Sequence, residues 1–193
     1  MSPWFAKAVV VAGFIAVGRI RMPHMRRGRG IRIATSRTGP REAIRSRLSQ
    51  VSALMLLVWI ASPAFAFADY RLRPLAFAAG GGLLAAGLWL FYRSHADLGA
   101  SWSSELEVRE GHRLVTEGVY GRVRHPMYAA FLLFALSGAI VIPNWVVGPS
   151  FLALWVSVLA LRIGPEERMM VEEFGPEYEE YARRTKRLVP GIW

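Results

Sequence analysis

The sequence of 193 residues contains no cysteine and only four histidines. Without a thiol, the chain forms no disulfides, thiolate–metal sites or iron–sulfur clusters, and it offers no cysteine nucleophile. No two histidines are spaced four apart on a helix, which argues against a structural zinc site, and we predict no metal. Acids are also scarce: 14 Asp and Glu face 24 Lys and Arg, which gives a net charge of +10.

Apolar residues make up 53% of the chain, and they gather in long blocks. The five blocks are Trp4–Ile20, Val51–Ala68, Pro74–Tyr92, Met127–Ile142 and Trp145–Leu161. A helix needs about 20 apolar residues to cross a bilayer. We therefore predict an all-α fold: one integral membrane domain over 1–193, a bundle of about five transmembrane helices with a cytoplasmic C-terminal helix.

The last two blocks are short, and only Pro143-Asn144 separates them. A Pro-Asn pair is a turn signal, so we predict a tight helical hairpin over 127–161. A re-entrant hairpin that does not cross the bilayer is the alternative, because hydropathy alone cannot separate the two.

The basic residues lie between the apolar blocks. Arg19–Arg47 holds ten arginines, Arg93–Arg124 holds five, and Arg162–Arg187 holds six basic residues. Cytoplasmic loops collect Lys and Arg. Five crossings then place the N-terminus outside and the C-terminus inside, at the inner membrane if the source is bacterial. Residues 1–92 would form three helices with an arginine-rich cytoplasmic loop over 19–47, and residues 93–193 would carry the polar chemistry.

The arginine-rich loop suggests an anionic partner. It has no acid except Glu42, which suits contact with anionic membrane lipids. No aromatic residues are interleaved to stack on bases, so we predict no nucleic acid partner.

The stretch Gly80–Ala85 matches the pattern G-x-G-x-x-A of dinucleotide-binding loops. Such a loop needs a preceding strand, whereas these glycines lie inside an apolar helix. The small residues Ala78, Gly82 and Ala86 recur every four positions, so we expect them to form a face for close helix packing.

The densest polar cluster runs from His112 to Tyr128 and ends where the fourth block begins. Pro126 suits the first turn of a helix, where the backbone amides of Met127 and Tyr128 would be free to bind an anion. Tyr120 and Tyr128 offer aromatic faces for a cation or a purine. Interfacial anchoring is the alternative reading, since Tyr and Arg are enriched at membrane surfaces.

A second cluster follows the fifth block. Arg162 ends the apolar run, Gly164-Pro165 is expected to break or kink the chain, and Glu166 and Glu167 would open a new helix. Two interpretations are open. The residues cap the ends of the two helices, or the Arg and a carboxylate face one pocket. Further apolar residues at helical spacing predict one stripe on the terminal helix: Met170, Phe174, Tyr178 and Tyr181.

At these clusters the sequence resembles the isoprenylcysteine carboxyl methyltransferase family, within the membrane methyltransferases that include the phospholipid N-methyltransferases. The resemblance covers roughly Trp102 to the C-terminus. It is carried by His112-Arg113-Leu114-Val115, Gly118-Val119-Tyr120, Arg124-His125-Pro126-Met127-Tyr128, Glu166-Glu167, Phe174-Gly175, Tyr178 and Tyr181.

The resemblance implies S-adenosylmethionine as cofactor. It implies a cofactor site made of Glu105, His112, Arg113, Leu114, Val115, Tyr120, His125, Pro126, Met127, Tyr128 and Glu166. The family often has Gln where this chain has Glu105. The family also implies that Arg162, four residues before Glu166, handles the substrate.

Methyl transfer from a sulfonium needs the donor and the acceptor held in line and close, without a metal. A carboxylate acceptor needs only positioning, for which Arg162 is the candidate; an amine or thiol must lose a proton, for which Glu167 or His125 would serve. We predict a lipophilic small-molecule or lipid acceptor and no obligate protein partner. Two alternatives are an NADPH-dependent membrane reductase, since sterol reductases are similar in this region, and a non-catalytic lipid-binding protein.

Overall fold

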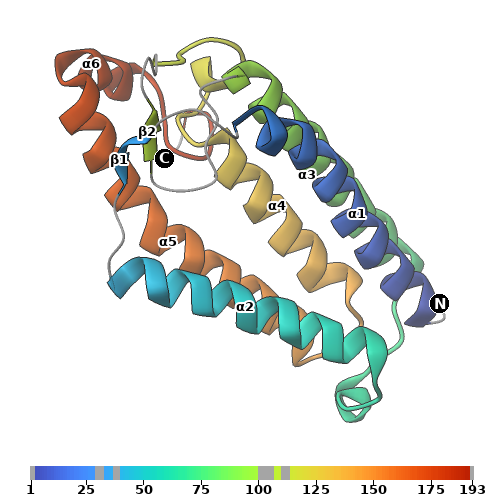
Figure 1. Cartoon of the computed structure of the whole chain (residues 1–193). Coiled ribbons are helices and arrows are strands. Elements are labelled where there is room, and N and C mark those ends of the chain that lie inside the picture. Colours follow the sequence, from blue (N-terminus) through green and yellow to red (C-terminus); the bar gives the residue numbers. More distant parts are fainter. Residues whose placement is uncertain (1–2, 29–32, 37–39, 100–106, 110–113, 192–193) are drawn as a thin grey trace.

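The computed structural model describes residues 3–28, 33–36, 40–99, 107–109 and 114–191, and its described part is a helical bundle (Figure 1). The helices are α1 (Pro3–Gly28), α2 (Pro40–Ala61), α3 (Pro74–Leu98), α4 (Pro126–Val141), α5 (Val147–Phe174) and the short α6 (Pro176–Arg184). Helix α3 packs against α1 and α4, and α5 packs against α4 and α2. The predicted all-α fold is confirmed, and only residues 142–146 separate α4 from α5, which pack against each other.

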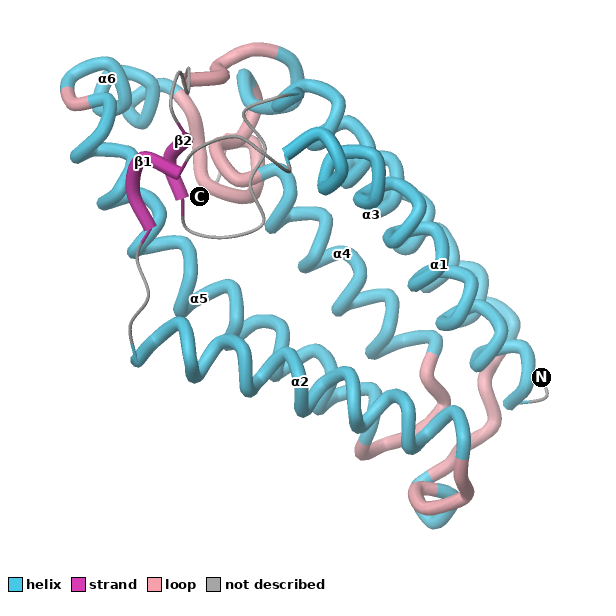
Figure 2. The backbone as a smooth tube through the Cα atoms, in the orientation of Figure 1, coloured by secondary structure: helices cyan, strands magenta, loops and turns pink. Residues whose placement is uncertain are grey.

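The loops contain a short feature that the sequence analysis did not predict. Strand β1 (Ile33–Ser36) pairs antiparallel with β2 (Glu107–Arg109), with Thr35 opposite Val108 (Figure 2). Single-turn 3-10 helices occur at Ala66–Ala68 and Gly118–Gly121. The pairing joins the segment after α1 to the segment after α3, at the end of the bundle where α4 begins.

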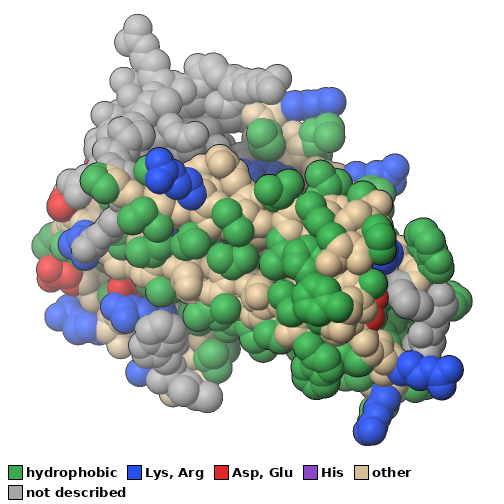
Figure 3. Space-filling view, turned by 90° about the horizontal axis from the view of Figure 1, so that it is seen from below, with side chains coloured by type: hydrophobic (Ala, Val, Ile, Leu, Met, Phe, Trp, Pro, Cys, Tyr) green, Lys and Arg blue, Asp and Glu red, His purple; other side chains and the backbone are tan. Residues whose placement is uncertain are grey.

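The outer surface of the helices is apolar. In the described part of the chain, three helices are long and apolar enough to cross a membrane: Glu42–Ala61, Pro74–Leu98 and Val147–Phe174. Helix α4, with 16 residues, is shorter. Large apolar side chains are exposed along the bundle, among them Trp4, Phe14, Leu54, Leu57, Leu75 and Trp89. Figure 3 shows one such face, on which hydrophobic side chains are spread along the bundle. A surface of this kind is typical of helices that face lipid.

The two termini lie at opposite ends of the bundle (Figure 1). At the N-terminal end, the fully buried Asn144 ties the α4–α5 turn to the α2–α3 connection. Its Nδ2 donates to the Phe65 carbonyl oxygen at 2.7 Å and to Asp69 Oδ1 at 2.6 Å. Its Oδ1 accepts from the Val146 and Val147 amides at 3.0 and 2.9 Å, which satisfies two donors at the start of α5.

We expect Asn144→Ala to lower the free energy of unfolding by about 2–3 kcal/mol. The substitution removes the side-chain partners of two backbone amides, a carbonyl and a carboxylate, and unsatisfied buried groups cost about 1–3 kcal/mol. The melting temperature in detergent measures the effect. Cofactor binding should stay unchanged in the fraction that remains folded, because Asn144 lies at the end of the bundle opposite the C-terminus; an unchanged melting temperature would contradict this role.

The close contact between α3 and α4 uses other small residues than those predicted. A Cβ at Gly80 would lie 2.4 Å from Val141 Cγ2, and one at Gly87 would lie 2.7 Å from Phe134 Cε1. In contrast, nothing lies within 4 Å of a Cβ at Gly82. The expectation that Ala78, Gly82 and Ala86 form the packing face is therefore wrong. Gly80 and Gly87 are seven residues apart, two helical turns, and face α4 together.

The predicted arginine-rich loop over 19–47 is mostly helical. Helix α1 continues to Gly28, and α2 begins at Pro40. The physical reasons are local: cations are favoured in the last turns of a helix, while a first-turn proline and Glu42 suit the start of one. Only residues 29–39 separate the two helices, so Arg21 and Arg45 project from rigid elements.

Helix α5 does not break at Gly164-Pro165. It is one helix over Val147–Phe174, with Pro165 inside it. Proline is tolerated within membrane helices because the surroundings satisfy the freed backbone groups. The helix instead ends at Gly175, whose φ of +53° suits glycine. Consequently the predicted stripe is split: Met170 and Phe174 belong to α5, whereas Tyr178 and Tyr181 belong to α6.

Candidate functional site

A cavity of about 350 Å³ lies at the end of the bundle where α4 begins. All six helices and the segment before α4 contribute to its wall. Of the residues predicted for the site, those in the wall are Leu114, Val115, Tyr120, His125, Pro126, Met127, Tyr128, Arg162 and Glu166. Glu167 is not in the wall. Glu105, His112 and Arg113 lie outside the described residues.

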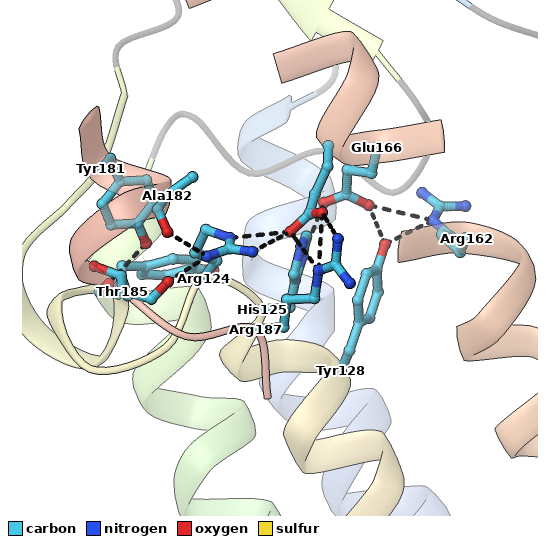
Figure 4. Close-up of polar contacts among 11 residues, drawn as sticks. Arg124, His125, Tyr128, Arg162, Glu166, Tyr181, Ala182, Thr185 and Arg187 are labelled. Atoms are coloured by element: carbon cyan, nitrogen blue, oxygen red, sulfur yellow. Dashed lines mark hydrogen bonds and ion pairs between the residues drawn. The ribbon is translucent and has the colours of Figure 1, made fainter. Parts of the chain in front are cut away.

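Two hydrogen bonds and an ion pair join Tyr128, Arg162 and Glu166 in a triangle on one side of the cavity (Figure 4). The Tyr128 hydroxyl donates to Glu166 Oε2, and Arg162 Nε donates to the same hydroxyl oxygen at 2.8 Å. Arg162 Nε also lies 3.7 Å from Glu166 Oε2. Residues four apart share a helix face, so the unbroken course of α5 is what brings Arg162 and Glu166 together.

His125 lies next to the triangle, immediately before α4. Its ring stacks on Tyr128, with centroids 5.3 Å apart and planes 13° from parallel. Its Nδ1 lies 3.8 Å from Glu166 Oε1, and its Nε2 lies 3.3 Å from Glu167 Oε1. Its backbone amide donates to the Arg187 carbonyl oxygen at 3.0 Å, so the C-terminal segment fixes its position.

Glu167 is the centre of a cluster of ion pairs. Arg124 Nε and Nη2 donate to Glu167 Oε1 at 2.9 and 2.8 Å, and Arg187 Nη2 donates to Oε2 at 2.7 Å. The side chain is only 13% exposed. A carboxylate that accepts several charge-assisted hydrogen bonds is stabilised in its ionised form and is a weak base. The prediction of Glu167 as a catalytic base stays a prediction; in the structure its carboxylate binds Arg124 and Arg187 and lies beside His125.

The C-terminal part of the chain packs over the segment before α4. Arg124 Nη1 donates to the carbonyl oxygens of Ala182, at 2.9 Å, and Thr185 (Figure 4). The Tyr181 hydroxyl donates to the Tyr120 carbonyl oxygen at 2.7 Å. Burial raises the pKa of Tyr120 and raises the pKa of Tyr181 to about 12, so both phenols stay protonated near neutral pH.

Burial likewise raises the pKa of Tyr178, whose side chain lines the cavity and is 3% exposed. Its hydroxyl has no hydrogen-bond partner among the described residues. Buried hydroxyl groups are normally hydrogen-bonded, so this donor suits a polar atom of a bound ligand.

The cavity wall also contains polar residues from the N-terminal helices that the sequence analysis did not identify. These residues are Arg21 on α1, Arg45 and Ser49 on α2, and His95 on α3. His95 is fully buried, with Nδ1 2.8 Å from the Phe91 carbonyl oxygen and the His24 ring 5.1 Å away. A sequence signal could have identified these residues, because ionisable side chains on apolar helices are costly in a membrane and commonly mark a functional site.

The part of the wall around Glu166 suits a cation beside aromatic rings. Glu166 is the single acid among the described wall residues, and Tyr120, Tyr178, Tyr181 and Phe91 surround the same space. The volume lies at the lower end of the range of about 300–1,000 Å³ for small-molecule sites. Within the described part of the chain, no group of three or more His, Asp and Glu side chains is placed to hold a metal ion.

Comparison with known proteins places this site in a family context. A model of the isoprenylcysteine carboxyl methyltransferase (ICMT) family matches residues 82–172. Protein-S-isoprenylcysteine O-methyltransferase B of Arabidopsis thaliana is 36% identical over 96 residues, 49% of each chain. The Schizosaccharomyces pombe protein-S-isoprenylcysteine O-methyltransferase is 34% identical over 114 residues, 58% of this chain and 48% of that one. The chain thus spans about half the length of these curated relatives.

A solved structure shares the fold. The eukaryotic intramembrane Ras methyltransferase ICMT superposes with a TM-score of 0.56 at 23% identity, covering 81% of this chain and 54% of the other. The chain is therefore an integral membrane protein with the helical fold of that enzyme. The segment that matches the isoprenylcysteine carboxyl methyltransferase family, residues 82–172, includes Arg162, Glu166 and the start of α4.

Proposed function

We propose that this protein is a methyltransferase that uses S-adenosylmethionine to methylate a lipophilic acceptor. The observation that carries the proposal is the position of Glu166. It is the single acid in the described cavity wall, it is held by Tyr128 and faces His125, and it lies in the segment that matches the family. The relatives are named as methyltransferases, which supports the same reaction type here.

The described wall residues fit this cofactor. When bound, S-adenosylmethionine supplies a methyl group on a positively charged sulfur. The Glu166 carboxylate and the faces of Tyr120 and Tyr128 would hold that charge. The amides of Met127 and Tyr128, at the start of α4, would bind the carboxylate of the cofactor. By family resemblance, we propose that Leu114, Val115 and Pro126 complete the pocket, together with Glu105, His112 and Arg113.

The acceptor is proposed to be a carboxylate on an isoprenyl-like chain. The names of the relatives specify O-methylation of S-isoprenylcysteine. A carboxylate is already a nucleophile and needs orientation alone. The Arg162 guanidinium, fixed by Tyr128 and lying 3.4 Å from Glu42 Oε1, can donate two parallel hydrogen bonds to such a group. Apolar wall residues would accommodate the chain: Phe131, Trp155, Val158 and Leu159.

We further propose that the site opens toward the cytoplasm, since most of the basic residues of the sequence lie at or between the helix ends on this side. The C-terminus lies at the cavity end and the N-terminus at the opposite end (Figure 1), which agrees with an outside N-terminus and a single membrane domain.

A membrane reductase that binds NADPH is the second candidate. The observation in its favour is that Arg21 and Arg45 line the cavity, because a 2′-phosphate would need clustered arginines. The cation-binding character of Glu166 and the names of the relatives favour the methyltransferase.

We expect Arg162→Ala to lower kcat/KM for the acceptor about 10–100-fold, since hydrogen bonds to charged groups contribute about 1.5–3 kcal/mol. A labelled-methyl assay on lipids extracted from the host measures turnover, and product identification gives the acceptor. The control is Arg168→Ala, an exposed arginine on the same helix. Intact turnover of every methyl acceptor found would show that Arg162 does not handle the substrate.

A further inference from the structure

Two arginines in the cavity wall come from helices outside the family-matched segment. Arg21 lies on α1 and Arg45 on α2, whereas the match begins at residue 82. Helix α1 packs against α3, and α2 packs against α5, so the two arginines reach the cavity from different sides (Figure 1). Ser49, one turn after Arg45, is also in the wall and donates to the Arg45 carbonyl oxygen at 3.1 Å.

The positive charge of the cavity wall exceeds the negative charge. Four arginines stand against one acid in the described wall: Arg21, Arg45, Arg124 and Arg162 against Glu166. Outside the wall, Glu167 pairs with Arg124, and Glu42 is shared between Arg45 and Arg162. Arg21 is partly buried and experiences the positive charges of both Arg45 and Arg162. Buried like charges repel, so an anion between these guanidinium groups is stabilised.

The same cavity also has an apolar side. Phe131, Trp155, Val158 and Leu159 line it from α4 and α5. A ligand that satisfies both sides is an amphiphile with an apolar chain and an anionic group. Carboxylates and phosphates meet this description, and both are bound by guanidinium groups through paired hydrogen bonds.

We propose that Arg21 and Arg45 form a binding site for an anionic group of the methyl acceptor, carboxylate or phosphate, alongside Arg162. This proposal rests on the proposed function and specifies its acceptor class. The reacting group is oriented by Arg162, and the N-terminal helices determine which headgroup is accepted. These two arginines lie outside the matched segment. They therefore determine acceptor specificity in this chain, whereas the matched segment carries the methyl-transfer site.

The test compares Arg21→Gln and Arg45→Gln with Arg19→Gln and Arg47→Gln. The control arginines are exposed on the same two helices, two residues away. Binding to the purified full chain in neutral detergent is measured for N-acetyl-S-farnesylcysteine, farnesyl monophosphate and uncharged farnesol, and separately for S-adenosylmethionine and NADPH. Comparison of the carboxylate with the monophosphate identifies the preferred anion. Melting temperatures verify that each variant is folded, and Arg→Lys variants retain the charge if a Gln variant is unstable.

We expect each Gln variant to lose about tenfold in affinity for the preferred anionic probe, with farnesol and S-adenosylmethionine binding unchanged. The Lys variants should lose less, and the controls should match the unmodified protein. Equal losses for farnesol and the anionic probes, or wild-type affinity for the anionic probes in both Gln variants, would overturn the proposal. So would a selective loss of NADPH binding, which would assign the arginines to an anionic cofactor. Failure of the unmodified protein to bind S-adenosylmethionine would instead refute the proposed function.

Discussion

Replacing Glu167 by alanine is expected to destabilise the protein by about 3–5 kcal/mol and to abolish cofactor binding. The substitution leaves Arg124 and Arg187 without their shared carboxylate, and breaking a buried ion pair on one side has this cost. It also releases His125, whose Nε2 lies 3.3 Å from Glu167 Oε1, from its place beside Tyr128. Thermal melting in detergent measures the stability, and calorimetric titration with S-adenosylmethionine measures the binding.

The matched control is Glu173→Ala, which removes an exposed carboxylate from the same helix. Glu167→Gln separates charge from shape, because it keeps the size of the side chain and loses the negative charge. We expect it to be nearly as unstable as Glu167→Ala. A melting temperature for Glu167→Ala equal to that of the Glu173→Ala control would show that the ion-pair cluster does not hold the site together.

Replacing Glu166 by alanine is expected to weaken S-adenosylmethionine binding by tenfold or more, which corresponds to about 1.4 kcal/mol. The substitution removes the single acid of the described cavity wall, which faces the charge of a sulfonium. His125→Ala should have a similar effect, because its ring stacks on Tyr128 and lies beside Glu166. Titration calorimetry provides the dissociation constants.

The demethylated cofactor, in which the sulfur is neutral, sharpens this test. S-adenosylhomocysteine lacks the positive sulfur, so Glu166→Ala should weaken its binding less than it weakens S-adenosylmethionine binding. Equal weakening of the two ligands would mean that Glu166 contacts another part of the cofactor. Unchanged binding of both would remove Glu166 from the site.

Local sequence patterns were sufficient to predict the start of α4. Pro126 begins the helix, and His125 directly precedes it, because a first-turn proline costs no backbone hydrogen bond. The five hydrophobic blocks overlap α1 to α5 of the described chain, although the boundaries shifted: α2 ends at Ala61 rather than at Ala68. Signals of this kind depend only on residues that are close in sequence. They therefore predict local structure without knowledge of how the helices pack.

The unbroken course of α5 could not be predicted from local sequence patterns. Gly164-Pro165 ends most helices in water, whereas this helix continues to Phe174. Neighbouring helices and lipid change the balance, because a broken helix would expose backbone groups that no water can satisfy. The adjacent acids Glu166 and Glu167 were equally ambiguous. Successive helical residues point about 100° apart, so one faces the cavity and the other faces Arg124 and Arg187.

Local sequence patterns could not predict that the N-terminal helices contribute residues to the cavity wall. Arg21, Arg45 and His95 lie far from the polar clusters in sequence, and only the packing of α1, α2 and α3 brings them to the cavity. In the sequence, the excess of arginine indicates the orientation of the helices in the membrane. Its second role, to place positive charge around a ligand, follows from the helical course of residues 19–28 and 40–47.

Calorimetric titration of the purified protein with S-adenosylmethionine, S-adenosylhomocysteine and NADPH tests the proposed function most directly. A methyltransferase of this kind should bind the first two and not the third, and Glu166→Ala should lower the affinity for S-adenosylmethionine tenfold or more. Binding of NADPH alone, or of none of the three, would contradict a methyltransferase site built on Glu166.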